Sequence, residues 1–452
     1  MNVKIDSRKV EQGDIFVAIR TLNHDGHDYV EDAIKNGARQ VIVEEGSYSV
    51  DTLVVDDTRV FLAQYLKEHY YEKIKDLKLI GITGTNGKTT TCYLLWQALN
   101  KLDIKTAYIG TIGFYVNDLV MGVQNTTPEI LELYEMFLMC VESGCEYVVM
   151  EVSSHALDMG RVDGLLFDYA VFSNLTEEHL DYHSNFRNYA LAKQKLFYQL
   201  KSNGKAIVNV DDPSSYYYIL DENDTVTYGF SCADYQIILD SMNFQNSIFS
   251  ILCDNTITEY SSKLIGKYNL YNLTCVVILL QSIVGDVDLS SIISHIKAPK
   301  GRMDTIMYQD NQIIVDYAHT PDAVSSILST VLELKPNHIY TVIGCGGERD
   351  KYKRPMMAGI ASELSDMVIF TSDNPRSEDP YKIIDDMVQL LDKNNYEIEI
   401  NREKAIIMGV QMLEKNDILL VLGKGHETYQ VIDGVKYPFD DKLVVETFIS
   451  NI

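Results

Sequence analysis

The sequence lacks the features that mark exported or membrane-bound proteins. Its seven cysteines form no C-x-x-C pair and lie in apolar surroundings, which is typical of reduced core residues. No run reaches the roughly 20 apolar residues that a membrane span needs. Met1 is followed by a charged stretch instead of an apolar signal core. We therefore predict a cytoplasmic protein without a membrane partner.

Basic residues are scarce as well. The chain holds 39 lysines and arginines against 65 aspartates and glutamates, a formal net charge of -26. This balance argues against nucleic-acid binding through bulk electrostatics, so local cations and backbone amides must hold any anionic ligand. Hydrophobic residues make up 46% of the chain and no long low-complexity tract interrupts them, which predicts a globular protein.

The length and the pattern of elements predict three α/β domains. At about 150 residues per domain, 452 residues correspond to roughly three. Residues 1–77 alternate short strands near 14–19, 39–45 and 52–57 with a helical stretch near 29–37. Residues 78–299 repeat strand–helix units and add short strands over 225–262, expected as an antiparallel extension. A polar break at HIKAPKGRMD precedes a second strand–helix series over 300–452.

Repeated strand–helix units predict a mostly parallel sheet with helices on both faces. We thus expect a central doubly wound parallel sheet, a small N-terminal α/β domain and a C-terminal Rossmann-like α/β domain. The sequence shows no tandem repeat with a period of 20 to 50 residues.

A glycine-rich turn stands between an apolar strand and a long helix in LIGITGTNGKTTT. Backbone N–H groups and a helix N-terminus collect phosphate charge in this context, so we expect Lys88 to reach the terminal phosphates of ATP and Thr89 to bind Mg²⁺. Ile82 departs from the common G-x-x-x-x-G-K-[ST] form, and a turn that arose by chance is the alternative. The predicted nucleotide contacts of this loop are Gly84, Thr85, Asn86, Gly87, Lys88, Thr89 and Thr90.

One lysine is predicted to lie on the buried side of its helix. Within NYALAKQKLFYQL, the helical neighbours of Lys193 are Tyr189, Leu196, Phe197 and Leu200. Burial disfavours an ammonium group and lowers its pKa, which leaves a neutral amine able to capture carbon dioxide as a carbamate. The alternative is a lysine whose head reaches the surface.

The motif G-T-N-G-K-T-T, together with MEVSSHAL, NLTEEHLDYH, DNPRSEDP and GKGHETYQ, resembles the Mur ligase family over nearly the whole chain. The resemblance implies that Glu151 is a magnesium ligand and that His179 helps to hold a second Mg²⁺. It also implies a carbamate on Lys193 that orients the metal. Lys88, Glu151, His179 and Lys193 are thus the expected catalytic residues, and Thr89, Glu151, His179 and Lys193 the expected metal-holding ones.

The same resemblance implies where the substrate binds. DSRKVEQGDIFVAI matches the uridine-nucleotide module of the family, with Ser7 and Arg8 as contacts. The expected contacts to the UDP-N-acetylmuramoyl peptide are Thr126, Thr127, Ser153 and Arg161. A helix cap is the alternative for Thr126-Thr127-Pro128-Glu129, and Met159 stands where many relatives have glutamine.

For the third domain, the resemblance implies that Asn269 and Asn272 approach the adenine, and that Arg302 and Asp316 approach the phosphates and ribose. The D-N-P-R form favours meso-diaminopimelate over L-lysine, because Arg376 would pair with the distal carboxylate that lysine lacks. The expected amino-acid contacts are Arg349, Asp373, Asn374, Pro375, Arg376, Gly423 and Glu427.

The resemblance therefore implies an ATP- and Mg²⁺-dependent ligase that extends UDP-N-acetylmuramoyl-L-alanyl-D-glutamate through an acyl phosphate, and we expect it to be a monomer. The implied roles of the domains are UDP-substrate binding (1–77), ATP binding (78–299) and amino-acid binding (300–452). Alternatives are the same reaction with L-lysine or another amino acid, a folylpolyglutamate synthetase, an inactive nucleotide-binding paralogue and a switch GTPase. The DSR module and T-T-P argue against the folate enzyme, and no N-K-x-D segment supports the GTPase.

Overall fold

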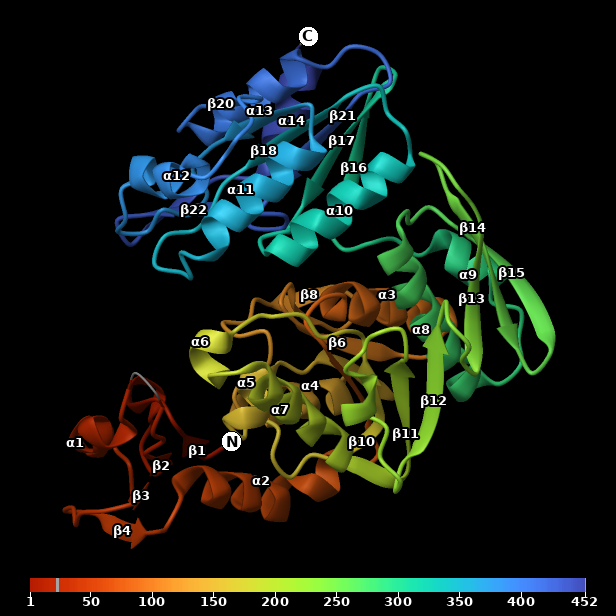
Figure 1. Cartoon of the computed structure of the whole chain (residues 1–452). Helices are drawn as coiled ribbons and strands as arrows, with labels where there is room; N and C mark the ends of the chain where they lie inside the picture. Colours follow the sequence, from red (N-terminus) through yellow and green to blue (C-terminus); the bar gives the residue numbers. More distant parts are fainter. Residues whose placement is uncertain (22–23, 452) are drawn as a thin grey trace.

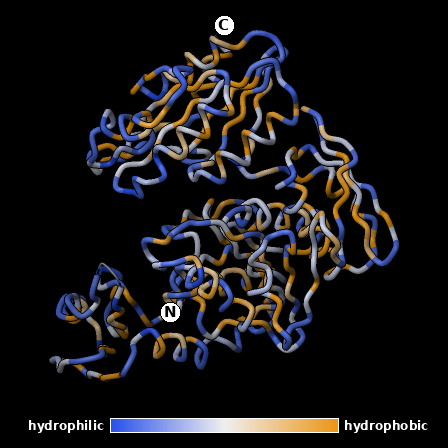
Figure 2. The backbone as a smooth tube through the Cα atoms, viewed as in Figure 1, coloured by the Kyte–Doolittle hydropathy of each residue, from blue (hydrophilic) through white to orange (hydrophobic). Residues whose placement is uncertain are grey.

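The computed structural model describes residues 1–21 and 24–451 and contains sheets of four, eleven, six and two strands. The three larger sheets follow one another along the chain (Figure 1). Hydrophobic residues concentrate along their interior strands (Figure 2). Across these described residues, no helix combines the length and apolar character needed to cross a membrane.

The first sheet is parallel, with strands in sequence order. Phe16 and Val41 pack against Val30 and Ala33 of the short helix α1. A longer helix, α2, then leads to the middle of the molecule, and its Leu62 and Leu66 join the middle core. The elements of this part are β1 (Val3–Lys4), β2 (Ile15–Val17), α1 (Val30–Lys35), β3 (Gln40–Val43), β4 (Asp51–Val54) and α2 (Thr58–Ile74).

The middle sheet has the order β15-β14-β13-β12-β11-β10-β5-β9-β6-β7-β8. Its strands are β5 (Lys78–Thr83), β6 (Thr106–Gly110), β7 (Gly113–Tyr115), β8 (Leu119–Met121), β9 (Tyr147–Glu151), β10 (Phe167–Phe172), β11 (Leu200–Asn209), β12 (Asp224–Gly229), β13 (Tyr235–Met242), β14 (Ser247–Cys253) and β15 (Thr256–Ser262). The strands from β6 to β12 pair in parallel across β9, β5, β10 and β11. The antiparallel extension predicted over 225–262 is confirmed for β13 to β15 but is wrong for β12, which pairs in parallel with both β11 and β13.

Alternate residues of the central strands pack into two different cores, which shows that helices cover both faces of this sheet. Ile80 and Ile82 of β5 join one core, whereas Leu79 joins the other. The helices are α3 (Lys88–Lys101), α4 (Ile130–Glu142), α5 (Ser154–Asp158), α6 (Leu180–His183), α7 (Phe186–Tyr198), α8 (Lys267–Val284) and α9 (Ser290–His295).

The third sheet has the order β16-β17-β21-β18-β19-β20 and is parallel except for β16. Ile314 and Val315 of β17 face different cores, so helices again cover both faces. The elements are β16 (Asp304–Tyr308), β17 (Asn311–Asp316), α10 (Pro321–Glu333), β18 (Ile339–Ile343), α11 (Lys353–Leu364), β19 (Met367–Phe370), α12 (Pro380–Val388), β20 (Tyr396–Ile398), α13 (Arg402–Gln411), β21 (Ile418–Leu422), β22 (Tyr429–Ile432), β23 (Val435–Pro438) and α14 (Asp441–Ser450).

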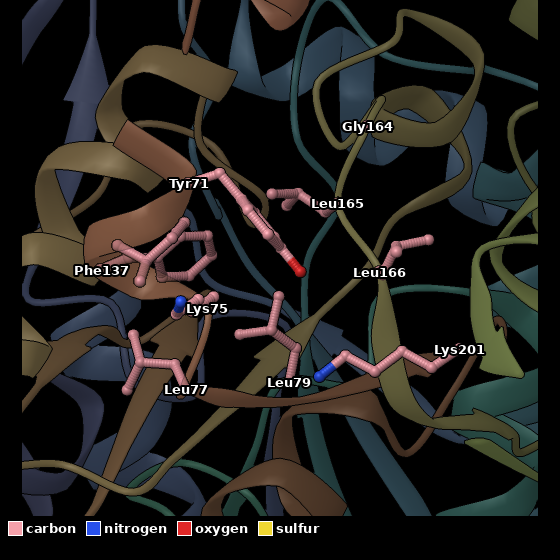
Figure 3. A pocket seen from close by; sticks show the side chains of 10 residues that line it. Tyr71, Lys75, Leu77, Leu79, Phe137, Gly164, Leu165, Leu166 and Lys201 are labelled. Atoms are coloured by element: carbon pink, nitrogen blue, oxygen red, sulfur yellow. The ribbon is translucent and has the colours of Figure 1, made fainter. Parts of the chain in front are cut away.

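A small, mostly apolar pocket lies where α2 meets the middle sheet (Figure 3). Tyr71 of α2, Leu79 of β5, Phe137 of α4 and Leu165 line it. Lys201 at its edge pairs with Asp168 at 2.9 Å, and the Asp168 carboxylate also accepts the backbone N–H of Leu79 at 2.9 Å. The pocket therefore lies at the packing interface between α2 and the middle sheet. The phosphate loop is at the opposite end of β5.

Candidate active site

The phosphate loop connects β5 to α3 and depends on two glycines. Gly84 has φ 144° and Gly87 has φ 87°, a range that residues with a Cβ rarely adopt. A Cβ on Gly84 would collide with Ser173 Oγ, and one on Gly87 would lie 2.7 Å from Asn272 Oδ1. The loop thus presents its backbone closely to its surroundings, as a phosphate cradle requires.

Lys88 begins helix α3 and folds back over this loop. Its Nζ donates to the carbonyl oxygens of Gly84 and Thr85, each at 2.8 Å. Burial lowers the pKa of Lys88, while the carboxylates of Glu178 and Glu151 oppose that shift. The lysine head therefore lies among the loop atoms that we expected to surround phosphate.

Glu151 ends β9, the strand beside β5, and its carboxylate is fully buried. Thr89 Oγ1 donates to Glu151 Oε2 at 2.8 Å, and Tyr108 OH donates to Oε1 at 2.6 Å. The backbone N–H of Thr111 also donates to Oε1, at 2.8 Å. Two predicted metal-holding residues, Thr89 and Glu151, are thus in direct contact.

Lys193 is buried on helix α7 with 1% of its surface exposed. Its Nζ donates to Gly84 O at 2.8 Å and lies 4.4 Å from the ring centre of Tyr189. Burial lowers the pKa of Lys193 well below its usual value, and the neighbouring charge of Lys88 lowers it further. The predicted burial is confirmed, and a side chain that reaches the surface is excluded.

His179 precedes α6 in the left-handed conformation, with φ 57°. Its ring centre lies 4.6 Å from that of His155 and 6.3 Å from that of Tyr189, the residue beneath Lys193. Its Nε2 lies 3.7 Å from Glu178 Oε2. Burial lowers the pKa of His179 and the positive charge of Lys88 lowers it further, against the opposing charge of Glu178. His179 therefore faces the same group of residues, although half of its side chain is exposed.

The predicted substrate residues of the middle sheet surround the start of α4. Thr127 Oγ1 donates to Glu151 O at 2.9 Å and accepts the backbone N–H of Ser153 at 3.0 Å. Arg161 Nη1 donates to Thr127 O at 3.2 Å. Thr126 Oγ1 lies 3.1 Å from Thr111 Oγ1. These residues are therefore continuous with the Glu151 side of the site.

Of the predicted nucleotide residues after β15, Asn269 and Asn272 belong to α8, and Asn272 lies beside Gly87 of the phosphate loop. Asn272 accepts from Thr91 Oγ1 at 3.0 Å and donates to Asn269 Oδ1 at 3.3 Å, both within the protein interior. Arg302 lies with its guanidinium 4.6 Å from the ring centre of Tyr317. Burial raises the pKa of Asp316, and Arg302 opposes the shift.

The predicted amino-acid contacts gather at the carboxyl ends of β18, β19 and β21. Asn374 Nδ2 donates to Glu427 Oε2 at 2.8 Å, so the two segments DNPR and GKGHE meet. A Cβ on Gly423 would lie 2.8 Å from Asp373 Oδ2. Arg376, which follows Pro375, has φ 53° and donates through Nη1 to Gly347 O at 2.6 Å. Arg349 is exposed on the neighbouring loop.

The predicted uridine contacts Ser7 and Arg8 lie in the short 3-10 helix Ser7–Lys9, between β1 and β2. Ser7 is buried and its carbonyl accepts Asn36 Nδ2 at 2.9 Å. The side chain of Arg8 is 87% exposed and pairs with Asp6 at 2.8 Å, so it is free to reorient toward a ligand. Both ring nitrogens of His27 are engaged within the protein, by Asp25 Oδ1 and the backbone N–H of Glu44.

Models of three parts of one family match the chain. Residues 1–70 match "Mur ligase family, catalytic domain", residues 82–280 match "Mur ligase middle domain" and residues 301–425 match "Mur ligase, glutamate ligase domain". The UDP-N-acetylmuramoyl-L-alanyl-D-glutamate--2,6-diaminopimelate ligase of Fusobacterium nucleatum is 42% identical over 98% of this chain and 92% of its own length. The chain belongs to the Mur ligase family.

Other Mur ligases agree with this assignment. The 2,6-diaminopimelate ligase of Clostridium perfringens is 41% identical over 100% of this chain and 95% of its own length. A solved structure of a ligase with the same name superposes with a TM-score of 0.72, is 33% identical and covers 99% of this chain and 94% of its own. MurF of Thermotoga maritima in complex with ADP has a TM-score of 0.70 at 18% identity and shares the fold. The predicted α/β fold class and the family resemblance are thus confirmed.

Three polar residues of this Mur ligase site were not predicted from the sequence. Tyr108 and Thr111 hold the Glu151 carboxylate, and the fully buried Lys424 donates to Glu427 Oε2 at 2.8 Å. Lys424 could have been found, because it follows the apolar strand Ile418–Leu422 in GKGHE. Tyr108 could not, since an aromatic residue inside a buried strand is usually a core residue.

Proposed function

We propose that this Mur ligase adds meso-2,6-diaminopimelate to UDP-N-acetylmuramoyl-L-alanyl-D-glutamate, with ATP as the energy source, in peptidoglycan precursor synthesis. One observation carries the chemistry: Lys88, Lys193 and the Thr89–Glu151 pair all meet at the phosphate loop. The full-length similarity to ligases that bear the diaminopimelate name supports the choice of reaction. We expect the reaction to take place in the cytoplasm, with the protein as a monomer.

The residues present fit Mg²⁺. In the described part of the chain, no three His, Cys, Asp or Glu side chains gather closely enough to hold a metal alone. Magnesium does not need such a cage, because it commonly binds one or two carboxylates, waters and substrate phosphates. Thr89, Glu151, His179 and a carbamate on Lys193 would supply the protein's share, and bound Mg²⁺ would neutralise charge on the transferred phosphoryl group.

The burial of Lys193 supports the proposed carbamate. Burial lowers the pKa of its amine well below the usual value and Lys88 lowers it further, which favours the neutral form that reacts with CO₂. The nitrogen lone pair would attack the carbon of CO₂, a new N–C bond would form and one N–H proton would leave to solvent. The product carries a carboxylate at the end of the side chain, beside the phosphate loop. Carbamate formation thus converts the Lys193 amine, which is unsuited to binding Mg²⁺, into a carboxylate oxygen donor.

The reaction proceeds in two steps. The γ-carboxylate of D-glutamate attacks the γ-phosphorus of ATP, which forms an acyl phosphate and releases ADP. Lys88 and the backbone N–H groups of residues 84–89 hold the phosphates during this transfer. The free amine of the amino acid then attacks the acyl carbon, loses a proton and expels phosphate, which leaves the new amide bond.

We assign the substrates to the parts of the chain as follows. Residues 1–77 bind the UDP moiety through Ser7 and Arg8, and Thr126, Thr127, Ser153 and Arg161 bind the muramoyl peptide. Residues 78–299 bind ATP, assisted by Asn269 and Asn272 at the adenine and by Arg302 and Asp316, from the following part of the chain, at the phosphates and ribose. Residues 300–452 bind diaminopimelate: Arg376 pairs with the distal carboxylate, with support from Arg349, Asp373, Asn374, Pro375, Gly423 and Glu427.

A ligation assay tests the proposal. The purified protein is given ATP, Mg²⁺ and UDP-N-acetylmuramoyl-L-alanyl-D-glutamate with either meso-diaminopimelate or L-lysine, and phosphate release and product mass are measured. We expect product with diaminopimelate and far less with L-lysine. A preference for L-lysine would overturn the role given to Arg376, and no product with any amino acid would favour an inactive paralogue.

A further inference from the structure

A fully buried arginine lies directly behind the predicted amino-acid site. Arg354, in the first turn of α11, has 0% of its surface exposed. Its Nη1 donates to Asp386 Oδ2 at 2.8 Å and its Nη2 donates to Glu378 Oε1 at 3.0 Å. Nη2 also reaches Gly346 O at 3.3 Å. Because none of its surface is exposed, Arg354 has no direct access to a substrate.

The partners of Arg354 join two loops. Gly346 belongs to the loop after β18, which also carries Arg349, and Glu378 belongs to the loop after β19, which also carries Asn374 and Arg376. The Glu378 carboxylate additionally accepts the backbone N–H of Glu348 from the first loop. The Arg354–Glu378 ion pair therefore connects the segments that hold the predicted amino-acid contacts, and Lys351 of the first loop adds a pair with Glu378 at 3.4 Å.

Backbone contacts extend this connection toward the substrate side. The N–H of Gly347 donates to Asn374 O at 2.9 Å, and Arg376 Nη1 donates to Gly347 O at 2.6 Å. The orientation of the Arg376 guanidinium thus depends on where the first loop lies. That position is fixed from behind by Arg354 and Glu378.

The charges make this connection specific for arginine. A planar guanidinium binds the two oxygens of a carboxylate and further acceptors in fixed directions, whereas a lysine ammonium cannot reproduce that geometry. The Arg354 guanidinium lowers the pKa of Glu378 to about 2, so Glu378 remains ionised near neutral pH. A buried arginine without its anionic partner is strongly unfavourable, so the two loops stay together.

We infer that Arg354 is a positioning residue for amino-acid selection: together with Glu378, it sets the spacing between Arg349 and Arg376 and so aligns Arg376 with the distal carboxylate. This inference rests on the proposed function, because it assumes that these loops bind the diamino acid. Arg354 acts only through other residues and takes no part in the chemical steps.

Arg354→Lys and Glu378→Gln test the inference in the full-length enzyme. At saturating ATP and UDP-substrate, we expect either variant to raise the KM for meso-diaminopimelate by about tenfold or more, since small misplacements of a binding group are costly. The KM values for ATP and the UDP-substrate should stay at the wild-type level, and kcat should fall much less than KM rises. A purely structural role would lower the active fraction, and with it kcat, without this selective change.

Two further variants keep the test decisive. Asp386→Asn alters the outermost partner, whose side chain is 38% exposed, and should raise the same KM to a smaller extent even if Arg354→Lys fails to fold. Lys393→Ala removes an exposed pair with Glu363 at the far end of α11 and should change no KM. Unchanged KM values for the diamino acid in folded Glu378→Gln and Asp386→Asn would overturn the inference. Failure of the wild-type enzyme to ligate any amino acid would instead overturn the proposed function.

Discussion

Two lysines of helix α7 show how strongly location decides the chemistry of a residue. Lys193 is buried against Tyr189 and Gly84, whereas Lys195 has a side chain that is 47% exposed and pairs with Asp158. Desolvation drives the pKa of the buried Lys193 far down. The helical spacing of apolar residues was enough to predict the burial of Lys193, because the residue lies within one regular helix.

Lys193→Ala should therefore abolish turnover, with a loss of roughly 100-fold or more, as expected when a group that supports charge in the transition state is removed. Short carboxylic acids added to the assay should restore part of the rate by occupying the space of the carbamate. Lys195→Ala is the matched control and should retain full activity. Undiminished ligation by Lys193→Ala would remove the carbamate from the mechanism.

A second residue-level prediction concerns stability. Arg402 and Asp441 form an ion pair of 2.7 Å in which neither side chain is exposed. Arg402→Met leaves Asp441 without its partner and should destabilise the third sheet by about 3–5 kcal/mol. Hydrogen exchange of the backbone amides of β21 measures this change locally. A local measurement is needed because a chain with several sheets need not unfold in a single two-state step.

The double variant Arg402→Met/Asp441→Leu is the appropriate comparison. It replaces the buried pair with apolar groups and should recover most of the lost protection, because no unpaired charge remains. Equal protection in Arg402→Met and the wild-type protein would show that the pair contributes nothing to local stability.

At the scale of elements, the sequence predicted the strand–turn–helix units well and the irregular ones poorly. The phosphate loop was recognisable because glycine, lysine and threonine occur in register between an apolar strand and a helix. Helix α2 was missed: its Leu62 and Leu66 are buried but Val60 is exposed, so its apolar stripe is narrow. Short strand β20 and helices α13 and α14 were missed as well, since tertiary packing stabilises them more than local pattern does.

The candidate site likewise contains residues that the sequence could predict and contacts that it could not. Residues placed by a strand end, such as Glu151, could be predicted from order along the chain together with the family resemblance. The Tyr108–Glu151 hydrogen bond of 2.6 Å could not, because it depends on which strands become neighbours in the sheet. Likewise, the link between Arg354 and Glu378 depends on the packing of α11 beside α12.

Gly87→Ala tests the geometry of the phosphate loop as an element. The substitution must adopt a positive φ of 87° and would bring its Cβ within 2.7 Å of Asn272 Oδ1. A left-handed conformation alone costs about 1–2 kcal/mol for a residue with a Cβ, so the KM for ATP should rise at least about tenfold. Gly359→Ala, in helix α11 with open space around its Cβ position, should leave that KM unchanged. Similar ATP kinetics in the two variants would contradict this account of the loop.

At the scale of the whole molecule, a direct contact links the phosphate loop to the third sheet's helices. Asn86 Nδ2 donates to Asp322 Oδ2 at 2.8 Å across 236 positions of sequence. Asp322 lies in the first turn of α10. Figure 1 shows this helix on the side of the third sheet that faces the middle sheet. The proposed reaction requires ATP and the amino acid to meet across this boundary, so the two sheets must hold a defined relative position during catalysis.

Asp322→Ala should loosen that arrangement, because it removes the acceptor for Asn86. One hydrogen bond contributes about 1 kcal/mol, which corresponds to roughly a fivefold shift between the arrangement seen here and more open ones. Small-angle X-ray scattering should therefore give a larger radius of gyration for Asp322→Ala. Asp322→Asn keeps an acceptor oxygen and removes a carboxylate whose pKa is raised by burial, so it should scatter like the wild-type protein. Lys267→Ala breaks only the exposed ion pair with Glu333 at 2.8 Å. Exposed pairs of this kind contribute little free energy, so this variant should also leave the radius of gyration unchanged. If Lys267→Ala expands the molecule as much as Asp322→Ala does, the Asn86–Asp322 contact is not what holds the two sheets in place.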